Sequence, residues 1–160
     1  MSTEYRIEPA GPKDVDAITD FNCAIARETE GKELNRPTVL GGVARGLRQG
    51  GEVTYFVAKC NGEAVGCLML TREWSDWRDG WLVWIQSVYV APSHRGRGVF
   101  RLLLSTSEAH VLQQQDVVGL RLYVEVDNAR AQSAYHRSGF VDPNYKVLEK
   151  IFPNRNLESD

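Results

Sequence analysis

The sequence predicts an α/β protein with a mixed, mostly antiparallel central sheet and helices on both faces, in the order β-α-α-β-β-β-α-β-α-β. Three observations predict this class. Apolar residues recur at helical spacing before residue 50, and the period changes to two from Val53 onward. Three strands then follow one another through short turns, which indicates an antiparallel meander. The remainder alternates helix and strand.

The first 51 residues predict one strand and two helices. A short strand at Tyr5–Pro9 is ended by Gly11-Pro12, and proline suits the first turn of a helix. The helix from Pro12 to about Glu28 is amphipathic. Its residues at helical spacing are Val15, Ile18, Phe21, Asn22 and Ile25. After a turn at 28–32, a second helix begins near Pro37 and stops at glycines 50 and 51.

The next 40 residues predict three consecutive strands. The first begins at Val53, and Asn61-Gly62 is a strong signal for a two-residue hairpin. The partner strand runs from Glu63 to Thr71. Residues 72–80 are polar and aromatic, which predicts a loop, and Trp81–Val90 returns as the central strand.

Residues 119–160 predict a strand, a helix and a closing strand or two. Alternation favours a strand over Gly119–Val126. Asp127 or Asn128 caps a helix that reaches Ser138, with Gly139 as its stop. Residues 140–152 predict a last strand or two, and Pro153–Asp160 a frayed tail.

Length and composition favour a single domain over residues 1–160. Hydrophobic residues make up 42% and charged residues 25%, as in ordinary globular proteins. A net charge of −2 gives no general reason to bind nucleic acid or acidic membranes. No apolar run approaches the ~18–20 residues that span a bilayer, and no signal peptide opens the chain. Three cysteines without metal-binding spacing add to the expectation of a cytoplasmic protein with reduced thiols and no metal: Cys23, Cys60 and Cys67.

The stretch Trp84–Leu104 carries the first functional signal. A buried strand is stopped by Pro92, and a basic glycine loop then opens a helix from about Gly98 to Gln114. Such a helix start presents unpaired N–H groups and partial positive charge to an anion. Three arginines add formal charge around the loop: Arg95, Arg97 and Arg101. The buried face of the helix is expected to carry Phe100, Leu103, Leu104 and Val111.

Two familiar phosphate loops do not fit this stretch. A Walker loop needs Lys-Ser/Thr after its glycines, and none follows here. A dinucleotide fingerprint needs a third glycine three residues after the second, where this chain has Arg101. The pattern that remains is Arg95-x-x-Gly98-x-Phe100.

The second signal lies in the helix after residue 128. Asn128, Ala131 and Tyr135 stand at i, i+3 and i+7, so a helix places them on one face. Small residues at 131 and 134 let a neighbour lie close, either a core element or a ligand chain.

Together the two patterns resemble the cofactor motifs of the GCN5-related N-acetyltransferases. The family's first motif is Gln/Arg-x-x-Gly-x-Gly/Ala, and its second matches Asn128-x-x-Ala131-x-x-x-Tyr135 followed by Gly139-Phe140. The resemblance covers residues 81–140. Phe100 departs from it, because the family has a small residue there. Its ring either packs under the helix or crowds a pyrophosphate.

The resemblance implies an acetyl-CoA-dependent N-acetyltransferase that acts on a primary amine of a small molecule, protein or peptide. Backbone groups of Val88 and Val90 would bind the pantetheine arm, and amides of the glycine loop the pyrophosphate. Tyr135 would protonate the leaving thiolate, since sulfur departs with negative charge. The implied cofactor-binding set is Val88, Tyr89, Val90, Arg95, Gly96, Arg97, Gly98, Val99, Phe100, Arg101, Asn128, Ala131 and Tyr135. A non-catalytic acyl-CoA-binding module is the alternative.

The general base and the acceptor stay open. Glu125 is the first candidate for the base, and the others are Glu28, Glu30, Glu73 and Asp76. An acceptor would meet residues of the two least family-like segments: Glu28, Trp74, Asp76 and Trp77. The two tryptophans form either an aromatic wall for a cationic amine or packing under a hairpin or in a dimer. The oligomeric state is open, a homodimer included.

Overall fold

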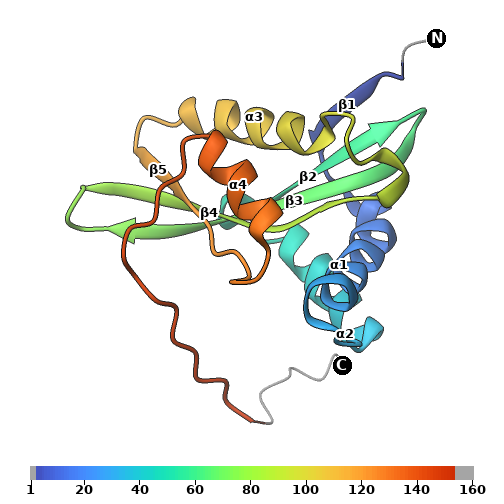
Figure 1. Cartoon of the computed structure of the whole chain (residues 1–160), viewed down its shortest axis with the longest axis horizontal. Coiled ribbons are helices and arrows are strands. Elements are labelled where there is room, and N and C mark those ends of the chain that lie inside the picture. The colour runs from blue at the N-terminus through green and yellow to red at the C-terminus, as the bar shows by residue number, and fades with distance from the viewer. Residues whose placement is uncertain (1–2, 154–160) are drawn as a thin grey trace. The chain divides into compact units, whose positions relative to one another are not determined.

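The computed structural model describes residues 3–153, and the chain divides into two compact units, Met1–Leu122 and Tyr123–Asp160. The first unit holds a five-stranded sheet in the order β1-β2-β3-β4-β5 (Figure 1). All neighbouring strands are antiparallel except β4 and β5, which are parallel. The predicted class of sheet is therefore confirmed. The strands are β1 (Tyr5–Pro9), β2 (Val53–Cys60), β3 (Glu63–Ser75), β4 (Gly80–Val90) and β5 (Val117–Arg121).

Helices cover both faces of this sheet (Figure 1). One face packs against α1 (Val15–Glu30) and α2 (Arg36–Leu47), and the other against α3 (Val99–Leu112). Three 3₁₀ turns complete the first unit: η1 (Pro12–Asp14), η2 (Gly50–Glu52) and η3 (Pro92–His94). No helix within residues 3–153 combines the length and apolar character needed to cross a membrane.

The core under α1 and α2 forms because β2 alternates. Tyr55 and Val57 point to these helices, while Phe56 points the other way and meets His110 of α3 with ring centroids 5.2 Å apart. The cluster on the α1/α2 side contains Ile18, Val43, Tyr55, Val57, Cys67 and Tyr89. All three cysteines are buried and free of disulfides, and burial raises the pKa of Cys67 to about 12.

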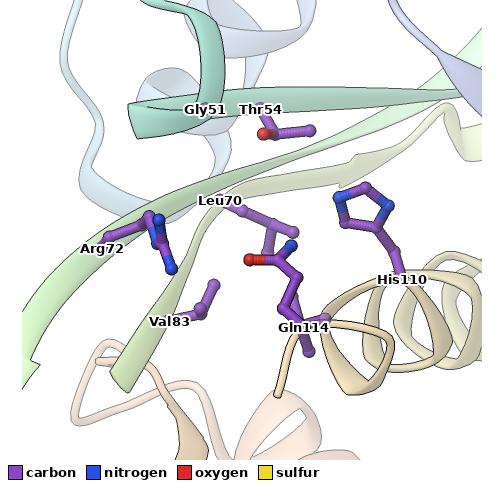
Figure 2. A pocket seen from close by; sticks show the side chains of 8 residues that line it. Gly51, Thr54, Leu70, Arg72, Val83, His110 and Gln114 are labelled. Atoms are coloured by element: carbon purple, nitrogen blue, oxygen red, sulfur yellow. The ribbon is translucent and has the colours of Figure 1, made fainter. Parts of the chain in front are cut away.

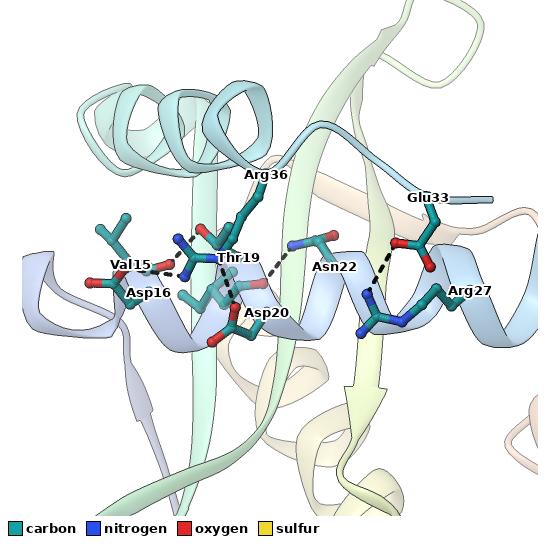
Figure 3. A network of polar contacts seen from close by, with 9 residues as sticks. Val15, Asp16, Thr19, Asp20, Asn22, Arg27, Glu33 and Arg36 are labelled. Atoms are coloured by element: carbon teal, nitrogen blue, oxygen red, sulfur yellow. Dashed lines mark hydrogen bonds and ion pairs between the residues drawn. The ribbon is translucent and has the colours of Figure 1, made fainter.

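Polar contacts join α1 to α2 and to the segment between them (Figure 3). Arg36 donates to Asp20 at 2.9 Å and to Asp16 at 3.3 Å, and Arg27 pairs with Glu33 at 3.6 Å. Because these pairs are exposed, they orient the two helices and the segment between them but contribute little to the free energy of unfolding.

The helix α1 ends later than predicted, because Gly31 with φ +63° supplies the left-handed stop after Glu30.

The β3–β4 hairpin is longer than predicted. Residues 72–75 continue β3 instead of forming a loop, and the turn shrinks to 76–79. The ring centroids of Trp74 and Trp81 lie 5.0 Å apart across the two strands, and the Arg72 guanidinium lies 4.3 Å from the Trp81 centroid. These cross-strand contacts stabilise a strand over a polar stretch that alone indicates a loop.

Trp74→Ala is therefore expected to lower the free energy of unfolding by about 1 kcal/mol, through loss of the pair with Trp81. Trp77 is the matched control, because its side chain at the turn is 84% exposed and Trp77→Ala should change stability by less than about 0.5 kcal/mol. Urea unfolding of both variants measures this. Equal loss in both would mean that the ring pair does not hold the hairpin.

A bulge interrupts the pairing of β3 with β4. Met69 lies opposite Gln86 but Cys67 lies opposite Tyr89, so β4 carries one extra residue, and Ser87 there has φ +53°. On β3, Gly66 passes close by: a Cβ at that position would stand 2.6 Å from the Tyr89 carbonyl oxygen. Only glycine fits there.

Gly66→Ala is expected to destabilise the protein by about 1–3 kcal/mol, since the obstructing atom is backbone and cannot rotate away. Gly41→Ala in α2 is the control, because no atom lies within 4 Å of its added Cβ and alanine favours helix over glycine. Denaturant midpoints compare the two. A neutral Gly66→Ala variant would show that β4 is not held in this register.

After residue 121 the structure has less strand than the sequence pattern predicts. The strand β5 ends at Arg121, five residues before the predicted end at Val126, and residues 140–153 form no strand. A strand needs a hydrogen-bonded partner, and the second unit offers none within its described residues. Its apolar side chains stay exposed: Val141, Tyr145, Val147, Leu148, Ile151 and Phe152. Except for Pro153, the predicted frayed tail lies outside the described residues.

Candidate functional site

The glycine loop connects β4 to α3 and has the geometry of an anion site. Gly96 and Gly98 have φ of +73° and +82°, which glycine adopts without strain, and no atom lies within 4 Å of a Cβ built on either. Gly98 is the N-cap of α3 and no side chain caps the helix. The first-turn N–H groups of α3 are therefore left for a ligand in open space.

The three arginines around the loop differ in what they contact. Arg97 and Arg101 are exposed, and within residues 3–153 their side chains have no hydrogen-bond or ion-pair partner. Arg95 instead donates its Nε–H to the Val90 carbonyl at 2.8 Å and its Nη2 to both carboxylate oxygens of Glu28, at 2.9 and 3.1 Å. Two guanidinium groups are thus available to an anion, and the third is already bound by protein.

The residues just before the loop tie it to the sheet. The Tyr5 hydroxyl of β1 and His94 Nδ1 are hydrogen-bonded at 2.9 Å, and their rings meet edge to face. This contact ties His94, two residues before Gly96, to β1. Tyr89 is buried beside the loop, and its pKa is raised first by burial and then by the Glu28 carboxylate.

One edge of β4 is open next to the loop. The strand β5 pairs only with residues Trp81–Trp84, so the part of β4 beyond has no strand partner on that side in the described chain. Ala91 N–H bonds Val65 of β3, so by alternation the backbone groups of Val90 face the open edge, as do those of Val88 two residues earlier. The Val90 carbonyl there already accepts from Arg95 Nε. An extended ligand arm could pair with this edge.

Val99, not Phe100, fills the buried position at the start of α3. Val99 is 1% exposed, whereas Phe100 is half-buried. This corrects the predicted face of the helix. Its buried residues are Val99, Leu103, Leu104, Ser107 and Val111. Phe100 therefore neither joins the core nor stands free in solvent.

In the second unit, the helix α4 (Ala129–Arg137) carries Ala131 and Tyr135 of the second motif, and Asn128 stands directly before its first residue. Asn128 Oδ1 accepts from Ala131 N–H at 3.1 Å, which makes Asn128 the N-cap. Tyr135 is buried, its ring contacts Phe140 at 5.6 Å, and burial raises its pKa to about 12. The hydroxyl therefore keeps its proton at neutral pH.

Glu125 does not lie on a strand, contrary to the prediction. It follows the end of β5, in the segment that turns into α4. Its Oε2 accepts from Asp127 N–H at 2.8 Å, and its carbonyl accepts from Gln132 at 3.2 Å. The carboxylate is thus held by the turn that starts the helix.

The other candidate carboxylates are dispersed over the first unit. Glu28 is held by Arg95, and Glu30 pairs with Lys32 at 3.9 Å. Asp76 lies in the exposed β3–β4 turn beside Trp77, whereas the Trp74 ring contacts Trp81 across the hairpin and stays about half exposed.

Glu73 has two partners that the sequence analysis missed. It accepts from Trp84 Nε1 at 3.1 Å and from Arg121 at 2.8 Å. These three residues meet because Trp84 of β4 lies opposite Arg121 of β5 on one side and opposite Thr71 of β3 on the other. Glu73 is two residues from Thr71 and therefore on the same face of the sheet. No local signal in the sequence shows this register.

A small hollow lies elsewhere, between the sheet and the C-terminal part of α3 (Figure 2). At about 1.5 Å per helical residue, His110 in its wall is about 18 Å along α3 from Gly98. Arg72 points into it, and its Nε is buried without a partner in the described chain. This hollow is separate from the glycine loop. Its lining is Gly51, Thr54, Leu70, Arg72, Val83, His110, Val111 and Gln114.

Known proteins with similar sequences and structures point to one family. The model described as "Acetyltransferase (GNAT) family" matches residues 18–140. Streptothricin acetyltransferase from Escherichia coli is 32% identical over 78 residues, which cover 49% of this chain but only 41% of that protein. A possible acetyltransferase from Clostridium difficile 630 is 36% identical with a TM-score of 0.85, over 92% of this chain and 97% of that one.

A structure from Clostridium acetobutylicum, described as a predicted acetyltransferase with acetyl-CoA, has a TM-score of 0.76. The alignment covers 92% of this chain and 96% of that chain. Its sequence identity of 15% makes it a likeness of fold alone.

Proposed function

Because this chain belongs to the acetyltransferase (GNAT) family, we propose that it transfers the acetyl group of acetyl-CoA to a primary amine of a small molecule, protein or peptide. The observation that carries the proposal is the uncapped start of α3 behind two glycines with positive φ. An anionic pyrophosphate has the charge and the hydrogen-bond acceptors that such a helix end binds. Acetyl-CoA is the co-substrate.

The cofactor would lie along the loop and the open edge of β4. We propose that the pyrophosphate accepts from N–H groups of Gly96–Phe100, with Arg97 and Arg101 supplying charge. The pantetheine arm would pair with backbone groups of Val88 and Val90 at the edge that β5 leaves open. We further propose that both units, residues 1–160, make one catalytic domain, to which α4 brings Asn128, Ala131 and Tyr135.

The chemistry needs no covalent enzyme intermediate. The amine nitrogen attacks the thioester carbonyl carbon, a C–N bond forms, and the C–S bond breaks as the tetrahedral intermediate collapses. We propose that the Tyr135 hydroxyl gives its proton to the departing thiolate, and that a backbone N–H of β4 stabilises the oxyanion. Glu125 is the proposed base for the ammonium proton. One of its oxygens is held by Asp127 N–H, which fixes the carboxylate.

The acceptor is the part of the proposal that needs a screen. Of the four candidate acceptor residues, Asp76 and Trp77 are exposed in the β3–β4 turn, whereas Glu28 and Trp74 contact other side chains. Streptothricin, named in the Escherichia coli relative, is the first compound to test.

Release of free CoA thiol from acetyl-CoA, measured with streptothricin, polyamines, amino acids and peptides, tests the function. We expect at least one amine to raise thiol release above the amine-free rate, with mass spectrometry showing the acetylated product. Tight binding of acetyl-CoA without turnover across the panel would contradict the enzyme and favour the acyl-CoA-binding module.

A further inference from the structure

We propose that Arg95 and Glu28 form a clamp that positions the glycine loop for the cofactor, and that Arg95 is not itself a ligand of the pyrophosphate. This inference rests on the proposed function, because it takes the pyrophosphate to lie on Gly96–Phe100. The family pattern alone counts Arg95 among the cofactor-binding residues. The contacts of its side chain assign it a different task.

The guanidinium of Arg95 is held by three groups of the protein. Its Nε donates to Val90 O at 2.8 Å, and its Nη2 donates to both oxygens of Glu28 at 2.9 and 3.1 Å. Its carbon lies 5.3 Å from the centroid of the Tyr89 ring. A planar guanidinium fixed by a carbonyl, a carboxylate and an aromatic ring has a defined orientation, which a lysine in its place could not reproduce.

These partners come from two elements, α1 and β4. Glu28 lies in the last turn of α1, and Tyr89 and Val90 end β4. Arg95 immediately precedes Gly96, so its side chain ties the first residue of the loop to both elements. The hydrogen bond between His94 and Tyr5 holds the neighbouring residue to β1. The backbone before Gly96 is therefore anchored on several sides, while the glycines remain open to a ligand.

Whether loss of the Glu28 charge weakens or tightens acetyl-CoA binding distinguishes a clamp from a simple charge effect. Glu28 is negative, so Coulomb's law predicts that its removal would tighten binding of an anionic cofactor. A clamp predicts the opposite, because Arg95 would lose its carboxylate partner and the loop N–H groups would lose their fixed orientation. Glu33 offers a matched control, since its carboxylate is exposed in the segment after α1 and pairs with Arg27 of α1.

Calorimetric titration of Glu28→Gln and Glu33→Gln with acetyl-CoA makes the test. We expect Kd to rise about 3–10-fold for Glu28→Gln, as for loss of a partly exposed, charge-assisted pair, and to stay unchanged for Glu33→Gln. Arg95→Lys should weaken binding as much as Arg95→Gln, and the Arg95→Gln/Glu28→Gln double variant no more than either single one.

Three outcomes are decisive. Unchanged or tighter acetyl-CoA binding by Glu28→Gln, in a wild-type background that binds, overturns the clamp alone. So does an Arg95→Lys variant that keeps wild-type affinity, because a phosphate ligand needs only the charge. If the wild-type protein does not bind acetyl-CoA, the proposed function and the clamp both fail.

Discussion

Replacing Gly98 by Asp is expected to abolish acetyl-CoA binding, raising Kd on the order of 100-fold or more, while the protein stays folded. A Cβ at Gly98 meets no atom within 4 Å, so the new side chain fits the fold. It would place a carboxylate at the uncapped helix start, where the phosphates are proposed to bind. Aspartate also tolerates positive φ better than most residues. Calorimetry measures the loss of acetyl-CoA affinity, and a thermal melt shows whether the variant stays folded.

Gly98→Asn is the control for this variant. Asparagine has nearly the same size and the same tolerance of positive φ, but it lacks the charge. We expect it to lose much less affinity than Gly98→Asp. Equal losses would show that bulk, not charge, blocks the loop. Wild-type affinity in Gly98→Asp would show that the phosphates bind elsewhere.

Tyr135→Phe is expected to leave acetyl-CoA affinity nearly intact and to lower kcat about 10–1000-fold. The ring would keep its buried place against Phe140, so the variant mainly loses the hydroxyl proton that is proposed to go to the thiolate. Burial raises the pKa of Tyr135 to about 12, so the hydroxyl is protonated across the neutral range and can donate to the thiolate. Steady-state kinetics at saturating acetyl-CoA give kcat, and calorimetry gives Kd.

Tyr123→Phe provides the comparison, since Tyr123 belongs to the same unit but is 63% exposed. Its kcat should stay within about twofold of wild type. An unchanged kcat in Tyr135→Phe would remove Tyr135 from the role of acid. A large rise in Kd with kcat unchanged would make its hydroxyl a binding group instead.

Features set by neighbouring residues could be predicted from the sequence. Asn61-Gly62 forms the expected hairpin, because both residues adopt positive φ, at +52° and +82°. Asn128 caps α4, and Gly98 starts α3 in the left-handed conformation. The glycine loop and the Tyr135 helix are built from such local signals, which is why their residues could be named in advance.

Features set by distant residues could not. Arg95 and Glu28 are 67 positions apart, and only the fold shows that one holds the other. The pairing of Trp74 with Trp81 turns a polar loop pattern into strand. The bulge at Ser87 depends on the register of β3 against β4. Conversely, a last strand or two is predicted over residues 140–152, but a strand forms only with a hydrogen-bonded partner, which the segment's own sequence cannot supply.

The most direct test of the central claim is a calorimetric titration of the wild-type protein with acetyl-CoA and, in parallel, with S-acetylpantetheine. The claim is that the loop Gly96–Phe100 binds the pyrophosphate. It predicts one-to-one binding of acetyl-CoA and much weaker binding of the analogue that lacks the pyrophosphate. Equal affinity for both compounds, or no binding of acetyl-CoA, would contradict it.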